Sequence, residues 1–203
     1  MIDAFIYGVI LAFGLIIPLG VQNIFVFNQG ATQRHFLHAM PSVLMASLCD
    51  TVLILCAVLG VSVAVFAIAW LKTVILVIGL FFLMYIGWIT WNSHPTKLHQ
   101  GDKPLSAKKQ IAFASSVSLL NPHALLDTIG VIGTNSLQFV GKEKWAFTTA
   151  CILVSCCWFF GLSILGHFLL RLDKNGLWLR SVNKISALII WAVAFYIGWQ
   201  LIK

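Results

Sequence analysis

The sequence predicts an all-α membrane protein with six transmembrane helices, arranged as a 3+3 inverted-topology repeat in which helices 1 and 4 are broken. Composition, six apolar runs and matching motifs in the two halves predict this fold. The chain has 203 residues, of which 60% are hydrophobic and 9% charged, and its mean hydropathy is +0.96. A soluble domain needs more polar surface than that. We therefore expect one transmembrane domain over residues 1–203, surrounded by membrane lipid.

Six apolar runs are long enough to cross the hydrocarbon layer of a membrane, which takes about 20 helical residues. In chain order they cover residues 4–27, 40–67, 71–91, 111–134, 145–170 and 185–202. The connections between these runs are short, so no soluble module is expected.

The two halves of the chain carry matching motifs at offsets that grow slowly along the sequence. Pro18 and Pro122 are 104 residues apart, and Gly60 and Gly166 are 106 residues apart. The Tyr-Ile-Gly-Trp sequences at 85–88 and 196–199 are 111 residues apart. An odd number of spans per repeat reverses the orientation of the second repeat, as in many secondary transporters. The predicted repeats cover residues 1–92 and 109–203, with a loop over 93–108.

Prolines interrupt the first and fourth predicted spans. Pro18 and Gly20 interrupt the first, and Pro122, which follows Asn121, interrupts the fourth. A proline removes one backbone hydrogen bond and clashes with the carbonyl four residues earlier. Paired breaks in the two halves of a transporter indicate its binding site, because broken helices at membrane depth must line a cavity or be buried in protein. The alternative is a pair of ordinary proline kinks.

Two carboxylates, Asp50 and Asp127, lie inside apolar runs. The other acidic residues fall at the start of the chain or in connections: Asp3, Asp102, Glu143 and Asp173. A charge at membrane depth is costly and therefore predicts a functional site. In the repeat register Asn23 aligns with Asp127 and Asp50 aligns with Cys156, so the symmetry is broken where the polar groups lie. Asp127 is the stronger candidate because it follows a break, and Asp50 could instead make a structural hydrogen bond.

The basic residues predict the orientation of the chain. Nine lysines and arginines fall in connections after spans one, three and five, and four fall on the opposite side. The positive-inside rule then places both termini outside. This distribution also accounts for the net charge of +7, so no nucleic-acid partner is expected.

Several other function classes are disfavoured. The five cysteines form no C-x-x-C pair and no zinc-type cluster, so we expect neither a metal site, nor another cofactor, nor thiol-redox activity. An intramembrane aspartyl protease would resemble a Gly-x-Gly-Asp pattern, which neither aspartate has. The chain is therefore not expected to be an enzyme.

The polar interruptions carry a family resemblance. Residues 18–23 read Pro-Leu-Gly-Val-Gln-Asn, and residues 120–128 read Leu-Asn-Pro-His-Ala-Leu-Leu-Asp-Thr. These segments, together with 49–54 and 158–162, resemble the LysE-type lysine/arginine exporters, which are bacterial inner-membrane proteins. The resemblance runs from the first span to the last. It implies export of basic amino acids across the cell membrane, driven by the proton gradient or the membrane potential.

The residues suggest how such export could work. Asp127 and Asp50 would attract the cationic side chain, and competition between this cation and a proton for one carboxylate is the minimal logic of antiport. The helix ends at the breaks would hold the α-carboxylate and α-amine, with hydrogen bonds from Gln22, Asn23 and Asn121. His123 would relay protons or cap a broken helix. The alternatives are export of neutral amino acids or of another cation, such as a metal ion. A homodimer is compatible with this fold, but no residue pattern argues for it.

Overall fold

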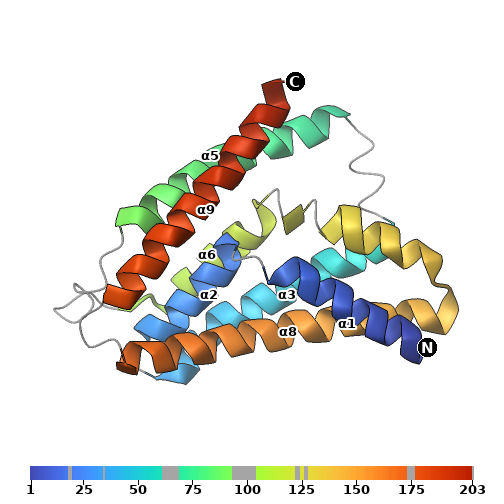
Figure 1. Cartoon of the computed structure of the whole chain (residues 1–203), viewed down its shortest axis with the longest axis horizontal. Helices are drawn as coiled ribbons and strands as arrows, with labels where there is room; N and C mark the ends of the chain where they lie inside the picture. Colours follow the sequence, from blue (N-terminus) through green and yellow to red (C-terminus); the bar gives the residue numbers. More distant parts are fainter. Residues whose placement is uncertain are drawn as a thin grey trace.

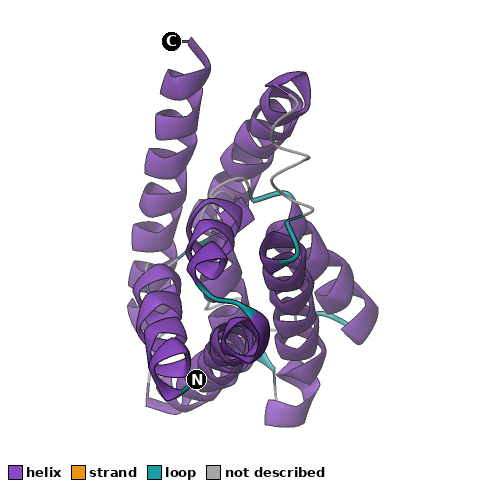
Figure 2. Cartoon of the chain, turned by 90° about the vertical axis from the view of Figure 1, so that its right-hand side faces the viewer, coloured by secondary structure: helices purple, strands orange, loops and turns teal. Residues whose placement is uncertain are grey.

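The computed structural model describes residues 1–17, 20–33, 35–60, 69–92, 104–121, 124–125, 128–172 and 177–202. All regular structure in these ranges is helical (Figure 2). The α-helices are α1 Ile2–Ile16, α2 Val21–Thr32, α3 Met40–Val58, α5 Ala69–Asn92, α6 Ala107–Leu119, α8 Gly141–Leu172 and α9 Leu177–Ile202. Three short elements join them: the 3-10 helices η1 Phe36–Ala39 and η4 Ser136–Gln138, and the π-helical segment η3 Thr128–Gly133.

The all-helical prediction is confirmed for the described residues, whereas the number of spans is not. Two helical segments, Phe36–Val58 and Gly141–Leu169, are long and apolar enough to cross a membrane, and α1 with α2 passes the same criterion as one bent span. Helices also lie within the other predicted runs, but none of them meets the criterion over its described residues. The six-span arrangement therefore stays a prediction.

Several helix boundaries differ from the apolar runs of the sequence, and the largest differences lie in α3 and α9. The described part of α3 ends at Val58, and Gly60 then adopts a φ of +78°, a left-handed conformation that favours glycine. The rest of that run, residues 61–68, lies outside the described residues. In contrast, α9 begins at Leu177 instead of 185, because polar residues with ordinary helix propensity extend the helix beyond its apolar part.

Both predicted breaks fall between helical segments. The axes of α1 and α2 differ by 81°, and the connection between Ile16 and Val21 contains Pro18, which lies outside the described residues. The second interruption follows Leu119, where α6 ends, and helical structure is described again at 124–125 and from Thr128 onward. Residues 122–123 and 126–127 lie outside the described part of the chain.

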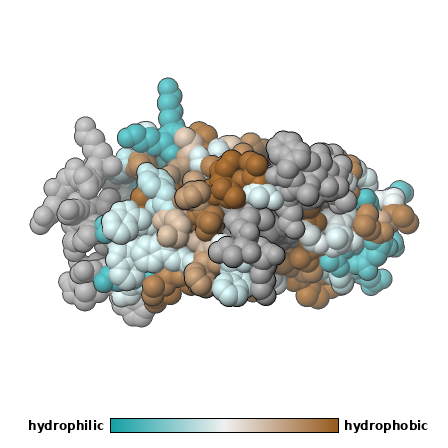
Figure 3. Space-filling model, turned by 90° about the horizontal axis from the view of Figure 1, so that it is seen from above, coloured by the Kyte–Doolittle hydropathy of each residue, from teal (hydrophilic) through white to brown (hydrophobic). Residues whose placement is uncertain are grey.

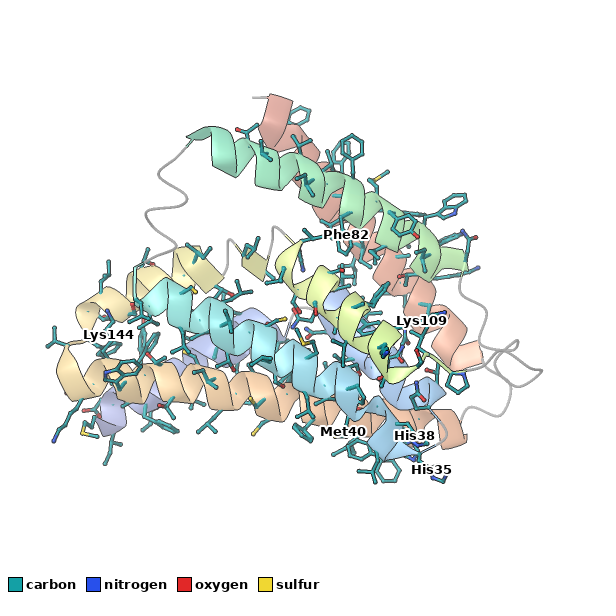
Figure 4. All side chains as sticks on the ribbon, turned by 180° about the vertical axis from the view of Figure 1, so that it is seen from behind. His35, His38, Met40, Phe82, Lys109 and Lys144 are labelled. Carbon is teal, nitrogen blue, oxygen red and sulfur yellow. The ribbon has the colours of Figure 1, made fainter. Side chains whose placement is uncertain are left out.

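The helices run alternately toward two ends of the molecule (Figure 1). In that view α1 and α2 run in succession toward the left, α3 returns toward the right, and α5 runs left again. The second half follows the opposite course: α6 and η3 run toward the right, α8 toward the left, and α9 upward to the right, where the chain ends. Lys109, His35 and His38 lie at the end of the molecule opposite Lys144 (Figure 4).

The long helix α8 organises the packing, since it contacts α1, α2 and α3, whereas α5 and α9 mainly contact each other and run in opposite directions (Figure 1). Three apolar clusters fill the spaces between these helices. One joins α1, α3, η3 and α8 around Phe147, one joins α2, α3 and α8 around Phe159, and one connects α2 and α6 to the α5–α9 pair around Ile190. Many large apolar side chains remain exposed, as expected beside lipid, and several brown hydrophobic residues lie near the centre of the face in Figure 3.

Glycines allow α2 and α8 to approach closely. A Cβ atom at Gly30 would collide with the backbone carbonyl of Ser163, and one at Gly166 would collide with the carbonyl of Phe27. Small residues serve this purpose between helices in membranes, where packing replaces the hydrophobic effect as the driving force. The α2–α8 contact is therefore a backbone-to-backbone contact.

A buried amide layer lies where α2 ends and where α6 and α9 begin. Gln110 is 1% exposed, and its Nε2 donates to the carbonyls of His38 (2.8 Å) and Leu105 (2.9 Å). Gln33 donates to the same Leu105 carbonyl (3.0 Å), and Asn28 donates to Asn183 Oδ1 (3.0 Å). These bonds tie α2 to α9 and join the connections after α2 and before α6, on the side that the sequence predicts to be cytoplasmic.

Replacing Gln110 with leucine is expected to lower the free energy of unfolding by about 2 kcal/mol, because two donated hydrogen bonds are lost and the His38 carbonyl loses this donor. The measurement is denaturant or thermal unfolding of the purified protein in detergent. Gln138→Leu is the matched control, since Gln138 is exposed at the opposite end; it should change the stability by no more than about 0.5 kcal/mol. Equal stability of the two variants would contradict a structural role for this layer.

Candidate functional site

A cavity of about 160 Å³ lies at the centre of the helices, where the two interrupted segments meet α3 and α8. Its wall is mostly apolar, with contributions from α1, α5 and α9. The polar side chains that the described residues contribute to its wall are Gln22, Asn23, Asp50, Asn121, Thr128 and Ser155. A cavity of about 150 Å³ can hold a benzene-sized molecule, so this one is large enough for a small organic ligand.

Among the described residues, Asp50 is the acidic residue that lines this cavity. It lies on α3, and both carboxylate oxygens accept a hydrogen bond: Oδ1 from Gln22 Nε2 (2.9 Å) and Oδ2 from Ser155 Oγ (2.8 Å). Its neighbours on the two sides therefore belong to α2 and α8. Among the described residues, the ion pair that the structure contains is the exposed one between the N-terminal amine and Glu143, so no described cation neutralises Asp50.

The first break supplies the start of α2 to the cavity wall. Gly20 caps α2 in an extended conformation, with φ −73° and ψ 171°, and no side chain caps this helix end. Residues 20–23 all line the cavity. Asn23 Nδ2 donates to the carbonyl of Ile16 (2.8 Å), one of the carbonyls that the end of α1 leaves without a helical partner. Asn23 thus stabilises the break itself in addition to lining the cavity.

The second break supplies Asn121, Ala124 and Thr128 to the cavity wall. Asn121 is 5% exposed and follows the end of α6. Its backbone carbonyl accepts a hydrogen bond from the Leu125 amide (3.1 Å), which links the two sides of the interruption. The end of α6 and the start of α2 therefore border the same cavity.

The structure brings together five of the nine residues that the sequence predicts for the site: Gln22, Asn23, Asp50, Asn121 and Gly20. The other four are Pro18, Pro122, His123 and Asp127, and they lie outside the described residues. Sequence reasoning missed Ser155 and Thr128. The repeat contained a signal for Ser155, because it aligns with Cys49, the residue beside Asp50, at the offset of 106 residues.

The described residues contain no cluster of three or more His, Cys, Asp or Glu side chains that could bind a metal ion. The donors around Asp50 are instead an amide and a hydroxyl, which are neutral hydrogen-bond donors. Such an arrangement can hold a carboxylate in a fixed orientation while its charge remains available to a ligand.

Comparison with known proteins identifies the family. The model of the LysE type translocator matches residues 13–200. The chain is 53% identical over 199 residues to the "Putative amino-acid transporter YisU" of Bacillus subtilis, covering 98% of this chain and 90% of that protein. It is 32% identical over 205 residues to the arginine exporter protein ArgO of Salmonella typhi, covering 98% and 94%. It is 29% identical over 207 residues to the ArgO of Serratia proteamaculans, covering 98% of each. No solved structure matches the chain significantly.

The match extends over nearly the whole chain, including both interrupted segments and the helices that carry Asp50 and Ser155. Apolar helices long enough to cross a membrane agree with a transport protein. The chain therefore belongs to the LysE family of membrane translocators, which export amino acids.

Proposed function

We propose that this protein exports basic amino acids, arginine or lysine, across the bacterial inner membrane as a secondary active transporter. The observation that carries the proposal is the Asp50 carboxylate, which lies in the central cavity without a cationic partner among the described residues. In surroundings of low dielectric constant, a carboxylate attracts a cationic side chain much more strongly than in water. The arginine exporters among the relatives support a basic substrate.

The helix ends at the cavity offer sites for the backbone groups of an amino acid. The start of α2 has no side-chain cap and carries the positive end of the helix dipole, which suits the substrate α-carboxylate. The end of α6 has carbonyl groups and a negative dipole end, which suit the α-amine. Gln22 and Asn121 line the cavity near these ends, where their amides can orient the substrate. The proposal also includes His123 and Asp127, whose roles rest on the sequence because both lie outside the described residues.

We further propose that the protein has six spans in a 3+3 inverted repeat, and contacts between α5 and α9 support this. Gly87 on α5 lies against the Trp191 ring on α9, and Gly198 on α9 lies against Leu80 on α5. At the repeat offset of 111 residues, Gly87 aligns with Gly198 and Leu80 aligns with Trp191. The two contacts are therefore equivalent under a pseudo-two-fold exchange of the halves.

A second pair of contacts supports the same exchange. Gly30 on α2 lies against Ser163 on α8, and Gly133 in η3 lies against Ala57 on α3, with 3.3 Å from its Cβ position to the Ala57 carbonyl. Gly30 aligns with Gly133 at an offset of 103 residues, and Ala57 aligns with Ser163 at an offset of 106 residues. The alternating direction of the helices in Figure 1 agrees with an odd number of crossings in each half.

The experiment expresses the protein in bacteria that lack their own basic amino-acid exporters. Expression is expected to increase tolerance to the toxic arginine analogue canavanine and to speed the efflux of preloaded labelled arginine or lysine. Cells carrying the empty vector are the control. Tolerance to metal ions alone, or efflux of neutral amino acids alone, would overturn the basic substrate in favour of the corresponding alternative.

Reconstitution into proteoliposomes tests the energy coupling separately. An imposed pH gradient or membrane potential is expected to drive labelled arginine against its concentration gradient. Transport that only equalises the two concentrations, whatever gradient is imposed, would contradict secondary active export while leaving the choice of substrate intact.

A further inference from the structure

Ser155 is the residue of α8 that contacts the carboxylate of Asp50. It is 3% exposed and lines the cavity, and its Oγ lies 2.8 Å from Asp50 Oδ2. A serine hydroxyl can form its hydrogen bond within its own helix, as Thr148 does with the carbonyl of Lys144 (2.7 Å). Ser155 instead donates across to α3, so its hydroxyl serves the carboxylate.

The two donors on Asp50 fix the plane of its carboxylate. Gln22 donates to one oxygen from α2, and Ser155 donates to the other from α8. A carboxylate offers about four acceptor sites, so about two remain for a ligand. Because both of these donors are neutral, they orient the group without compensating its negative charge.

The two donors come from different halves of the chain. Gln22 lies in the first predicted repeat and Ser155 in the second, so the carboxylate bridges the halves that must move relative to each other in alternating access. At the symmetry-related position to Ser155 the chain has Cys49, whose thiol is a weaker donor. The repeat therefore has a hydroxyl at the position that faces the Asp50 carboxylate, and a thiol at the equivalent position in the other half.

We propose that Ser155 is a positioning residue for substrate binding: it holds the Asp50 carboxylate in the orientation that receives the cationic group of the substrate. This inference rests on the proposed function, since it acts through the cation site at Asp50. Ser155 itself needs no contact with the substrate. Its loss should therefore weaken substrate affinity and leave the turnover of bound substrate largely intact.

The test measures efflux of labelled arginine by Ser155→Ala in proteoliposomes, with the amount of protein determined for each preparation. The KM for arginine is expected to rise about tenfold, the size expected for one hydrogen bond to a charged group. The maximal rate per protein should stay within about twofold of wild type, because an interaction made equally in all bound states affects KM alone. Ser163→Ala is the matched control, since Ser163 is a fully buried serine of the same helix that does not line the cavity.

Two further variants separate positioning from a general effect on folding. Ser155→Thr retains the hydroxyl and has the cavity beside it for the added methyl group, so it should keep KM within about threefold of wild type. Ser155→Cys keeps the size of the side chain but weakens the donor, so its KM should fall between those of wild type and Ser155→Ala.

An unchanged KM in Ser155→Ala, or a loss of maximal rate with no change in KM, would overturn the inference. So would a KM in Ser155→Thr equal to that of Ser155→Ala. The proposed function fails differently, because in that case the wild-type protein itself would not transport arginine or lysine.

Discussion

Asp50→Asn is expected to reduce arginine efflux by at least about 30-fold, since removing one partner of a buried charge pair costs 2 kcal/mol or more. Asparagine has nearly the same shape as aspartate and can still accept a hydrogen bond from Ser155 Oγ. The change therefore removes the negative charge while preserving the packing between α2, α3 and α8. The measurement is efflux of labelled arginine from preloaded cells, normalised to the amount of protein in the membrane.

Asp3→Asn is the matched control for this prediction. Asp3 lies exposed in the first turn of α1, away from the cavity, so the same chemical change should leave efflux within about twofold of wild type. If Asp50→Asn behaved like this control, Asp50 would be a structural residue, and the proposed cation site would have to lie elsewhere.

Asp127→Asn should be measured in parallel, because the sequence ranks Asp127 above Asp50. Asp127 follows the second break and aligns with Asn23, whereas the geometry of the described residues supports Asp50 alone. If both variants lose efflux, the two carboxylates share substrate and proton. If only Asp50→Asn does, the ranking from the sequence is wrong.

The polar part of the cavity was largely predictable from the sequence. Gln22, Asn23 and Asn121 follow or flank breaks in apolar runs, and Asp50 is a charge at membrane depth; each of these patterns is rare without a cause. The repeat offset also related the two breaks to each other. These local signals suffice to place the residues in one region of the fold.

For Ser155 the sequence contains only its alignment with Cys49 in the repeat, which does not predict the contact with Asp50. Serine is common in membrane helices, and its role depends on the rotation of α8 about its axis, which packing against α2 and α3 determines. The sequence also did not predict that Asn23 both lines the cavity and stabilises the break. Its bond to the Ile16 carbonyl exists because α1 and α2 meet at an angle of 81°, and the sequence predicts a break but not its angle.

The contact between α2 and α8 offers the strongest test of the packing. Gly166→Ala is expected to lower the free energy of unfolding by about 3 kcal/mol, at the upper end of the cost of overpacking, because the new Cβ would collide with the backbone carbonyl of Phe27. A backbone atom cannot rotate aside as a side chain can. The two helices must therefore move apart or bend, and the measurement is unfolding of the purified protein in detergent.

Gly161→Ala provides a control within the same helix. Gly161 has no atom within 4 Å of its Cβ position. Alanine there should stabilise α8 by up to about 1 kcal/mol, through helix propensity alone. If the two alanine variants had equal stability, the close approach of α2 and α8 would be wrong.

The same contact connects stability to transport. α2 carries Gln22 and α8 carries Ser155, so the distance between the two helices determines whether both can reach the Asp50 carboxylate together. Gly166→Ala should therefore raise the KM for arginine even at temperatures where the protein remains folded, whereas Gly161→Ala should not. A destabilised Gly166→Ala protein with a normal KM would show that α2 and α8 can separate near Gly166 without moving the two donors, and would confine the role of the glycine contact to folding.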